Sequence, residues 1–514
     1  MQQVIKQKRN SSRIFQSFID LHSLMKKLLS VLSLLLISLL LVSSSYAQAG
    51  SELDQFLKGE GELDIDQVLT IALANNPQIK RALLAIDDAN QLVKIAYAEV
   101  LPDISTSASY TRNVEIPVFF FEQNGTVVPV QAGTDNAWLA SVNVSQNLFK
   151  GEALVGISSA NVFKMVQRES YRLIAQQIIT QARVAYYEVL IAKESVRLQE
   201  AQINRLEENL AENKIRLDAG LIEEYDVLRL EVQLSNQRPQ LIDAKYALDQ
   251  AYRSLNVVIG IPATMEYTVT GDLNTYDFVQ TDNMESGNAV LQEVDQMNPF
   301  EFSASNTNNG DFAENRGDIS VLDAQIKLKD REITAIKSRF LPTVSAFYNL
   351  QYNAQEPGAP NFFRNPQPPP GIPGGTNPIR SQALGISVSL PIFQGLQRLS
   401  DVTRARIQRK DLSEQRRETK LNALNEITTA KENLNKAFET ADARKQALLQ
   451  AQRGYEIAKA RFDNGLGSQL EITDAETQVR EAELNYASLI YSYLVAKAQY
   501  DLATGVVPLI DIKN

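Results

Sequence analysis

The chain has 514 residues, with 61 acidic and 51 basic residues and a formal net charge of −10. This acidic balance argues against binding to the phosphate backbone of a nucleic acid. There is no cysteine and one histidine, His22, so disulfides and thiolate metal sites are excluded, and we expect neither a metal site nor a cofactor.

Residues 26–47 have the three parts of a secretory signal peptide. Lys26-Lys27 form a basic start, 28–42 is an apolar run, and Ser45-Tyr46-Ala47 is a small-x-small cleavage site. The apolar run is shorter than the roughly 20 residues of a membrane-spanning helix. We therefore expect 1–47 to be a leader and signal peptide, and the exported chain to lack histidine. Because histidine is the commonest general base, its loss argues against an enzyme.

The exported chain is predicted to begin with a helix over 65–100. This helix is interrupted at Asn75-Asn76-Pro77, because proline ends one helix and can open the next. Leu101-Pro102 ends the helical pattern. Apolar and polar residues then alternate over 104–111, which predicts a strand with one apolar and one polar face.

A second alternating segment, 138–145, predicts a second strand of the same kind. Between the two strands, 114–137 is predicted to be a loop that carries an aromatic cluster, Phe119-Phe120-Phe121, and a turn at Asn124-Gly125. After the second strand, the chain is predicted to stay helical from about residue 150 to a turn at Asp218-Ala219-Gly220. At 1.5 Å per residue, this helix would be roughly 100 Å long.

The chain is predicted to return in a helix over 223–259, with a kink or short break at Pro239. The polar segment 261–316 is predicted to be an irregular linker. The plan then repeats, with a helix over 319–340 that ends at Leu341-Pro342. Two further alternating strands flank a loop rich in proline and glycine, 354–380.

A long helical hairpin ends the second half, turning at residues 463–467. Along both hairpins, apolar or small residues recur every seven positions, and adding 245 to a position in the first set gives its partner in the second. The first set is Ala182, Val189, Val196, Ile203, Leu210, Leu217, Val227, Leu234, Leu241, Leu248 and Leu255. The chain is thus predicted to be an internal duplication, with repeats over 48–260 and 317–505 and a tail over 506–514.

The four strands have the length and alternation of strands that cross an outer membrane at a tilt. Four strands do not close a barrel, and lipid does not tolerate an open sheet edge, so several chains would have to share one barrel. Two chains would give eight strands and three would give twelve. A soluble antiparallel sheet with one solvated face is the alternative. The heptads fit either a helical tube or a solid stalk.

The sequence resembles the TolC-like outer membrane efflux protein family over nearly all of the exported chain. The resemblance rests on Ala72-Leu73-Ala74-Asn75-Asn76-Pro77, the two Leu-Pro junctions, the strand ends Leu148-Phe149 and Ile392-Phe393, and two Arg-x-Asp-x-Gly-Leu hairpin tips. It implies a mainly α fold in which four strands per chain complete a shared 12-stranded barrel of a homotrimer. The helices would form a tunnel in the periplasm.

The resemblance also implies a function and partners. The protein would be a passive exit duct in the outer membrane, in contact with its lipids, for efflux or type I secretion. A periplasmic adaptor would recruit it to an inner-membrane pump of the RND or ABC type. In the family, acidic residues ring the closed periplasmic end, and the matching positions here are Glu471 and Asp474. Glu471 is also explained as part of a capping box that begins at Ser468.

The resemblance assigns further roles near the two hairpin turns. Tyr225 and Asp226 match a gate region, although both also fit as helix-start residues. Gly467 occupies a position where family members can carry a basic, gate-holding residue, so that contact is absent or rebuilt here. The tips, comprising Gly220, Leu221, Gly465 and Leu466, would dock the adaptor. Helix capping explains the two glycines without a partner.

Two other function classes remain open from the sequence. An exported coiled-coil scaffold or adaptor without a pore would use the hairpins as spacers. An outer-membrane enzyme, such as a lipase, would need a nucleophile with a base, and the exported chain is expected to lack histidine.

Overall fold

The structure is a computed structural model that describes residues 62–123, 125–131, 133–273, 276–279, 290–293, 316–356 and 379–507. The expected leader and signal peptide lie outside the described residues, as do most of the expected linker and most of the loop 354–380. The chain divides into two units. In the smaller unit, β1 (Glu62–Leu63) pairs in parallel with β6 (Thr268–Val269).

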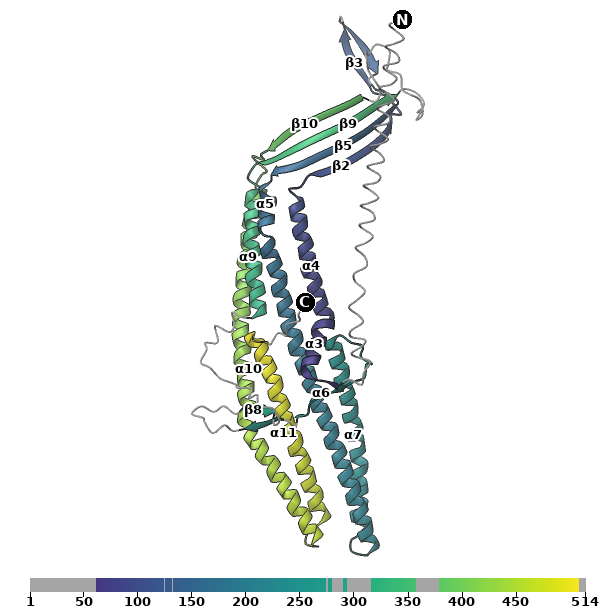
Figure 1. Cartoon of the computed structure of the whole chain (residues 1–514), viewed down its shortest axis with the longest axis vertical. Helices are drawn as coiled ribbons and strands as arrows, with labels where there is room; N and C mark the ends of the chain where they lie inside the picture. The colour runs from purple at the N-terminus through teal and green to yellow at the C-terminus, as the bar shows by residue number, and fades with distance from the viewer. Residues whose placement is uncertain are drawn as a thin grey trace, which may run out of the picture. The chain divides into compact units, whose positions relative to one another are not determined.

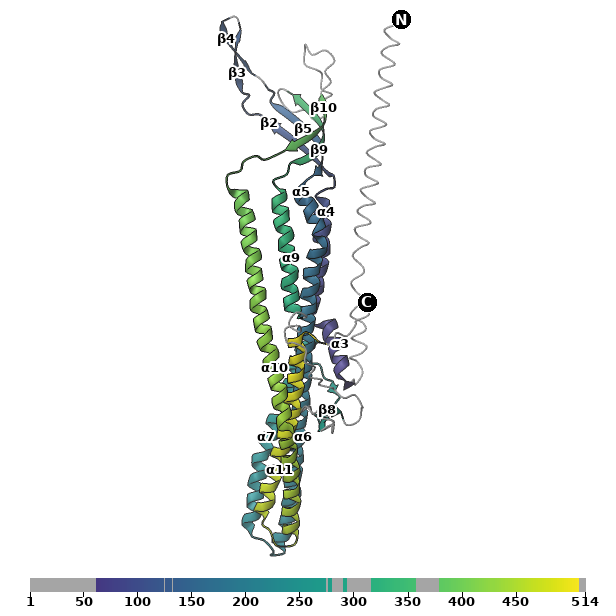
Figure 2. The ribbon, with the colours of Figure 1, turned by 90° about the vertical axis from the view of Figure 1, so that its left-hand side faces the viewer.

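The larger unit contains all other described elements and is coloured in chain order in Figure 1. Its helices are α3 (Ile65–Asn75), α4 (Pro77–Ala98), α5 (Gly151–Ser158), α6 (Ala160–Asp218), α7 (Glu224–Ile259), α9 (Gly317–Ser338), α10 (Gln397–Asp463) and α11 (Gln469–Thr504). Its strands are β2 (Asp103–Arg112), β3 (Val118–Gln123), β4 (Thr126–Gln131), β5 (Asn136–Phe149), β7 (Tyr276–Val279), β8 (Val290–Glu293), β9 (Thr343–Glu356) and β10 (Ile379–Ser389). Within this unit, the large sheet lies at one end of the helices and the hairpin turns at the other (Figures 1 and 2).

The four predicted strands form one antiparallel sheet in the order β10-β9-β5-β2. Its register aligns apolar residues across all four strands, in a row formed by Ile104, Val144, Tyr348 and Leu384. A row on the other face is polar and consists of Ser107, Ser141, Gln351 and Ser381. Because side chains alternate between faces, the sheet has one apolar and one polar face, as the sequence predicts.

Both edges of this sheet are open in the described chain, since β2 and β10 each pair with one strand only. The apolar face is also uncovered. Ile104 is 70% exposed, and Leu384 is 82% exposed. The single chain therefore leaves backbone groups at both sheet edges without hydrogen bonds from a neighbouring strand, and it leaves the apolar face of the sheet unburied.

The helices form two long hairpins, α6 with α7 and α10 with α11. The seven-residue repeat explains them, because its positions are buried or partly buried in the single chain. In the first hairpin, Ile203, Leu206, Leu230 and Leu234 form a buried apolar cluster. None of the helices in the described part of the chain is apolar enough, over a sufficient length, to cross a membrane.

Three predicted features differ from the structure. The loop 114–137 contains a hairpin, β3–β4, because aromatic and β-branched residues flank the turn beside Gly125. The helix predicted from residue 150 divides at Ser159, where the Ser158 and Ser159 hydroxyls both donate to the Val155 carbonyl oxygen at 2.8 and 2.7 Å. The short break expected as one alternative at Pro239 is absent, because Pro239 lies inside α7; the other alternative, a kink, stays a prediction.

Each repeat contains a contact that we call a joint. In the first repeat, the start of α4 lies beside the end of α7, and in the second, the start of α9 lies beside the end of α11. In the first joint, Asn76 caps α4 and donates from Nδ2 to the Val258 carbonyl oxygen at 2.7 Å. In the second, Arg316 precedes α9 and donates from Nη1 to the Ala503 carbonyl oxygen at 3.1 Å. The Leu-Pro junctions align Asn76 with Arg316, and the heptads align Val258 with Ala503. The duplication thus preserves the joint.

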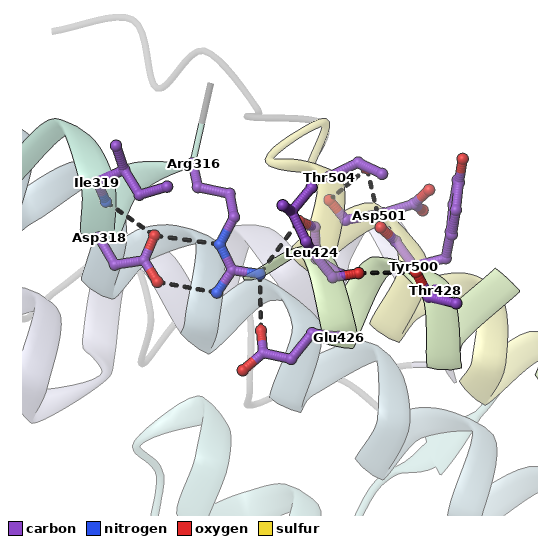
Figure 3. Close-up of polar contacts among 10 residues, drawn as sticks. Arg316, Asp318, Ile319, Leu424, Glu426, Thr428, Tyr500, Asp501 and Thr504 are labelled. Atoms are coloured by element: carbon purple, nitrogen blue, oxygen red, sulfur yellow. Dashed lines mark hydrogen bonds and ion pairs between the residues drawn. The ribbon is translucent and has the colours of Figure 1, made fainter. Parts of the chain in front are cut away.

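The two joints differ in charge. Arg316 also binds both carboxylate oxygens of Asp318, at 3.1 and 2.8 Å, and Glu426 of α10 at 2.7 Å (Figure 3). Close by on α11, Asp501 accepts from Arg183 of α6 and from Lys497, both at 2.8 Å. The residue that aligns with Asp501 is the neutral Asn256. The second joint is therefore a charged network that ties α9, α10 and α11 together, whereas the first joint uses an amide.

Candidate functional site

The two hairpin turns are the first part of the candidate site. At the first, Gly220 has φ 71° and donates to the Leu217 carbonyl oxygen at 2.8 Å. Leu221 donates to the Arg216 carbonyl oxygen at 2.9 Å. These two bonds define a Schellman motif, which ends a helix with a left-handed residue. Glycine is favoured there because it has no Cβ to oppose a positive φ.

The second turn repeats this geometry. Gly465 has φ 72° and donates to the Phe462 carbonyl oxygen at 2.9 Å, and Leu466 donates to the Arg461 carbonyl oxygen at 2.8 Å. In both turns, capping fully explains the glycine. Capping does not explain why the residue after the glycine is a leucine in both turns.

Leu221 and Leu466 project from the tips. They are 74% and 75% exposed, although the residue after the glycine of a Schellman motif often packs back onto its helix. Each hairpin tip therefore offers one large apolar side chain to a partner outside the chain.

The two tips contact each other through Arg216. Its guanidinium lies 4.4 Å from the centre of the Phe462 ring, 3.8 Å from a carboxylate oxygen of Asp463, and 2.6 Å from Glu212. The sequence contains Arg216 in the tip motif, but the contact joins two hairpins that are far apart in the chain. The arrangement holds the two exposed leucines on neighbouring tips.

The two acidic residues assigned to the constriction lie at the start of α11. Glu471 is at its first turn, where its backbone N–H donates to the Ser468 hydroxyl at 3.3 Å. Its carboxylate is 3.8 Å from the Arg461 guanidinium. Asp474 is exposed three residues further along. Both residues are exposed, on the side of α11 that faces away from its buried residues.

Tyr225 and Asp226 occupy the first turn of α7. Tyr225 is 68% exposed, and the Asp226 backbone N–H donates to the Glu223 carbonyl oxygen at 3.1 Å. In the described part of the chain, no hydrogen bond or ion pair joins either side chain to Glu471 or Asp474. The structure thus places them at the same end of the helices without bringing them together.

Two buried polar residues of α11, Gln469 and Glu476, were missed in the sequence. They are 5% and 2% exposed and hydrogen bond to Asn213 and Asn209 of α6. Burial raises the pKa of Glu476. One sequence signal could have identified them: Gln469 lies three residues before the apolar heptad position Ile472 and Glu476 four residues after it, so all three share one face of the helix. Among the described residues, no group of three or more acids or histidines is placed to hold a metal ion.

Comparisons with known proteins agree with this architecture. A family model described as outer membrane efflux protein matches residues 68–261 and again 310–506. Outer membrane protein TolC of Escherichia coli is 23% identical over 447 residues, which cover 85% of this chain and 81% of that protein. Alkaline protease secretion protein AprF of Pseudomonas aeruginosa is 22% identical over 452 residues, which cover 86% and 84%.

Solved structures share the fold. The open state of the MtrE outer membrane channel of Neisseria gonorrhoeae matches with a TM-score of 0.64 at 16% identity, covering 86% of this chain and 88% of that one. The CmeC outer membrane channel of Campylobacter jejuni matches with a TM-score of 0.62 at 19% identity, covering 86% and 85%. Because the family model matches two stretches that together exceed half of the chain, the chain belongs to the outer membrane efflux protein family and is an outer-membrane protein.

Proposed function

We propose that the protein is a passive exit duct, formed by three copies that share a 12-stranded barrel in the outer membrane. The helical hairpins would form a tunnel in the periplasm. A periplasmic adaptor would bind the hairpin tips and couple the duct to an energised inner-membrane pump. The chain itself would catalyse no reaction.

The four-stranded sheet is the observation that carries this proposal. It has a continuous apolar face, with Ile104 and Leu384 largely exposed, and two open edges. Exposed apolar residues fit a lipid-facing surface, and the polar row opposite fits a water-filled lumen. Pairing β2 of one copy with β10 of the next would satisfy both edges, which lipid otherwise forbids.

Two groups of residues at the hairpin-tip end of the helical part would have different tasks. Leu221 and Leu466, on tips held together by Arg216, would provide the apolar contacts for the adaptor. Glu471 and Asp474 would ring the narrow end of the tunnel in three copies. A ring of carboxylates attracts cations and repels anions, so the closed duct would be cation-selective.

Single-channel recording of the purified protein in a planar bilayer tests this proposal, together with the mass of the detergent-solubilised oligomer. We expect a trimer with a small, cation-selective conductance. The alternative, a coiled-coil scaffold, predicts a protein that dissolves without detergent and shows no conductance. That second result would overturn the duct.

A further inference from the structure

A groove lies where the large sheet meets the helices, at the end of the helices opposite the hairpin tips (Figures 1 and 2). It consists of two adjoining cavities of about 230 and 250 Å³, which share Glu152, Arg339 and Asp401. The start of α5, the end of α9 and the start of α10 form its walls. We call it the junction groove, and it is separate from the tips and from the acidic pair of α11.

The junction groove opens on the polar side of the sheet. Two strand residues line it, Thr343 of β9 and Ser389 of β10, and they form a cross-strand pair. Each is an even number of residues from the member of the polar row on its own strand, Gln351 or Ser381, so both point to the polar face. In the proposed duct, that face lines the lumen. Cargo that moves from the tunnel into the barrel would therefore pass the groove.

Two of the cations that line the junction groove are paired within the chain. The Lys150 ammonium binds the Glu99 carboxylate at 2.6 Å, and the Arg339 guanidinium binds the Glu152 carboxylate. These pairs join the start of α5 to the ends of α4 and α9. Their charges are compensated, so they contribute to the walls of the groove more than to its electrostatic character.

Arg398, in contrast, has no carboxylate partner in the described part of the chain. Its Nε donates to Gln394 Oε1 at 2.9 Å and its Nη1 to the Pro391 carbonyl oxygen at 3.4 Å, and both acceptors are neutral. The guanidinium lies 5.6 Å from the centre of the Phe340 ring. Its Nη2 donates to none of the described residues, so two N–H groups of a charged donor are free to bind a ligand.

A second cation and one acid complete the unpaired charges of the groove. Arg404 is exposed, and no ion pair or hydrogen bond joins its side chain to another described residue. Glu332, on the same side of α9, is paired with Lys329. Asp401 lines both cavities and forms no ion pair with a described residue. The unpaired cations therefore outnumber the unpaired acid, which favours an anionic ligand.

We propose that the junction groove binds the carboxylate of an organic anion that passes through the duct, with Arg398 and Arg404 as its binding residues. This inference rests on the proposed function and assigns a substrate class to it. A guanidinium matches the planar geometry of a carboxylate, and hydrogen bonds between the two are charge-assisted. The groove is open, and Asp401 opposes the anion. Binding is therefore weak enough for release, as conduction through a pore requires.

Thiol chemistry on the purified protein tests the site without requiring conduction. Because the chain has no cysteine, Gln397→Cys places a single thiol in the groove. Its rate of modification by an uncharged methanethiosulfonate reagent is measured with increasing benzoate. We expect benzoate to slow the modification in a saturable way. Benzamide, a neutral analogue of nearly the same shape, should have no effect.

Four charge variants, made together with Gln397→Cys, identify the binding residues. Arg398→Gln should weaken the protection by benzoate about tenfold or more, because hydrogen bonds from a charged donor are lost. Arg404→Gln, at an exposed position, should weaken it to a smaller extent. Asp401→Asn should strengthen it, because a negative charge is removed. Arg406→Gln, exposed on α10 outside the groove, is the matched control and should leave the protection unchanged.

Conductance tests the position of the groove in the lumen. The thiol of Gln397→Cys is modified in a planar bilayer with a maleimide that carries a polyethylene glycol chain. We expect the conductance to fall, because three chains would enter the lumen at one level.

The outcomes separate this inference from the duct itself. Equal protection by benzoate and benzamide, or protection that Arg398→Gln leaves unchanged, would overturn the anion site and leave the duct standing. A conducting protein whose conductance the modification does not change would overturn the luminal position, and with it the role in transport. A protein that conducts no ions in any variant would overturn the proposed function, whether or not benzoate protects the thiol.

Discussion

Arg316 is expected to fix the end of α11 through the second joint. Its side chain is 12% exposed and donates to Asp318 and Glu426 (Figure 3). It also donates to the Ala503 carbonyl oxygen. In Arg316→Gln, the charge and the forked geometry are both lost. The Ala503 carbonyl oxygen then loses its donor, and the last turn of α11 should open more often.

The size of this effect follows from the exposure of the partners. The pair with Glu426 contributes little, about 0–1 kcal/mol, because the Glu426 side chain is 54% exposed and screened by water. Asp318 keeps a hydrogen bond from the Ile319 backbone N–H at 2.8 Å in the first turn of α9. The bond from a charged donor to the Ala503 carbonyl oxygen contributes about 1.5–3 kcal/mol. We therefore expect a local loss of about 2 kcal/mol, or roughly 30-fold more opening.

Hydrogen exchange of the detergent-solubilised protein, followed by mass spectrometry, measures this opening. Peptides that contain residues 500–504 should exchange roughly 30-fold faster in Arg316→Gln, as the estimate above requires. Peptides over 256–260, at the first joint, should not change. Arg406→Gln, on an exposed position of α10, is the control for loss of a positive charge. Unchanged exchange at 500–504, or an equal increase at both joints, would refute the reasoning.

Three further predictions concern the tips, the acidic pair and the first joint. Leu221→Asp combined with Leu466→Asp should abolish export and leave the trimer intact by native mass, since both side chains are exposed; normal export would contradict adaptor docking. Glu471→Gln combined with Asp474→Asn should increase conductance and reduce cation preference, and an unchanged permeability ratio would place them away from the aperture. Gly260→Ala should lower the melting temperature, because φ is 76° and the new Cβ would lie 2.6 Å from a backbone carbonyl oxygen. We expect a loss of about 1–3 kcal/mol, and a melting temperature equal to that of the unmodified protein would contradict it.

The features that depend on local sequence could be predicted. The seven-residue repeat gave the long hairpins, glycine marked both turns, and Pro77 marked the break between α3 and α4. Alternation identified the strands and assigned their faces, which the register confirms. The sequence pattern does not predict the β3–β4 hairpin, although aromatic and β-branched residues flank Gly125, because these two strands are short and do not alternate between apolar and polar residues as the other four do.

The contacts between distant segments could not be predicted. Asn209 and Glu476 are 267 residues apart, and nothing local to either residue specifies its partner. The same holds for the sheet order β10-β9-β5-β2, and for the bond from Arg316 to the end of α11 across 187 residues. The sequence pattern of one helix shows which of its residues are polar and which face they share. Only the packed structure shows which of them are buried together.

The open sheet has a consequence for the order in which the chain folds. Each helical hairpin forms from contacts that are close along the chain, whereas β5 and β9 pair residues such as Asn143 and Asn349, which are 206 positions apart. Contacts that are close along the chain form faster than distant ones, so the helical hairpins should be complete while the strands are still unpaired. During that interval, unpaired strands with an apolar face are open to wrong pairing and aggregation. Biogenesis of this protein should therefore be limited by strand assembly, and chaperones that shield strands should matter more to its yield than helix stability does.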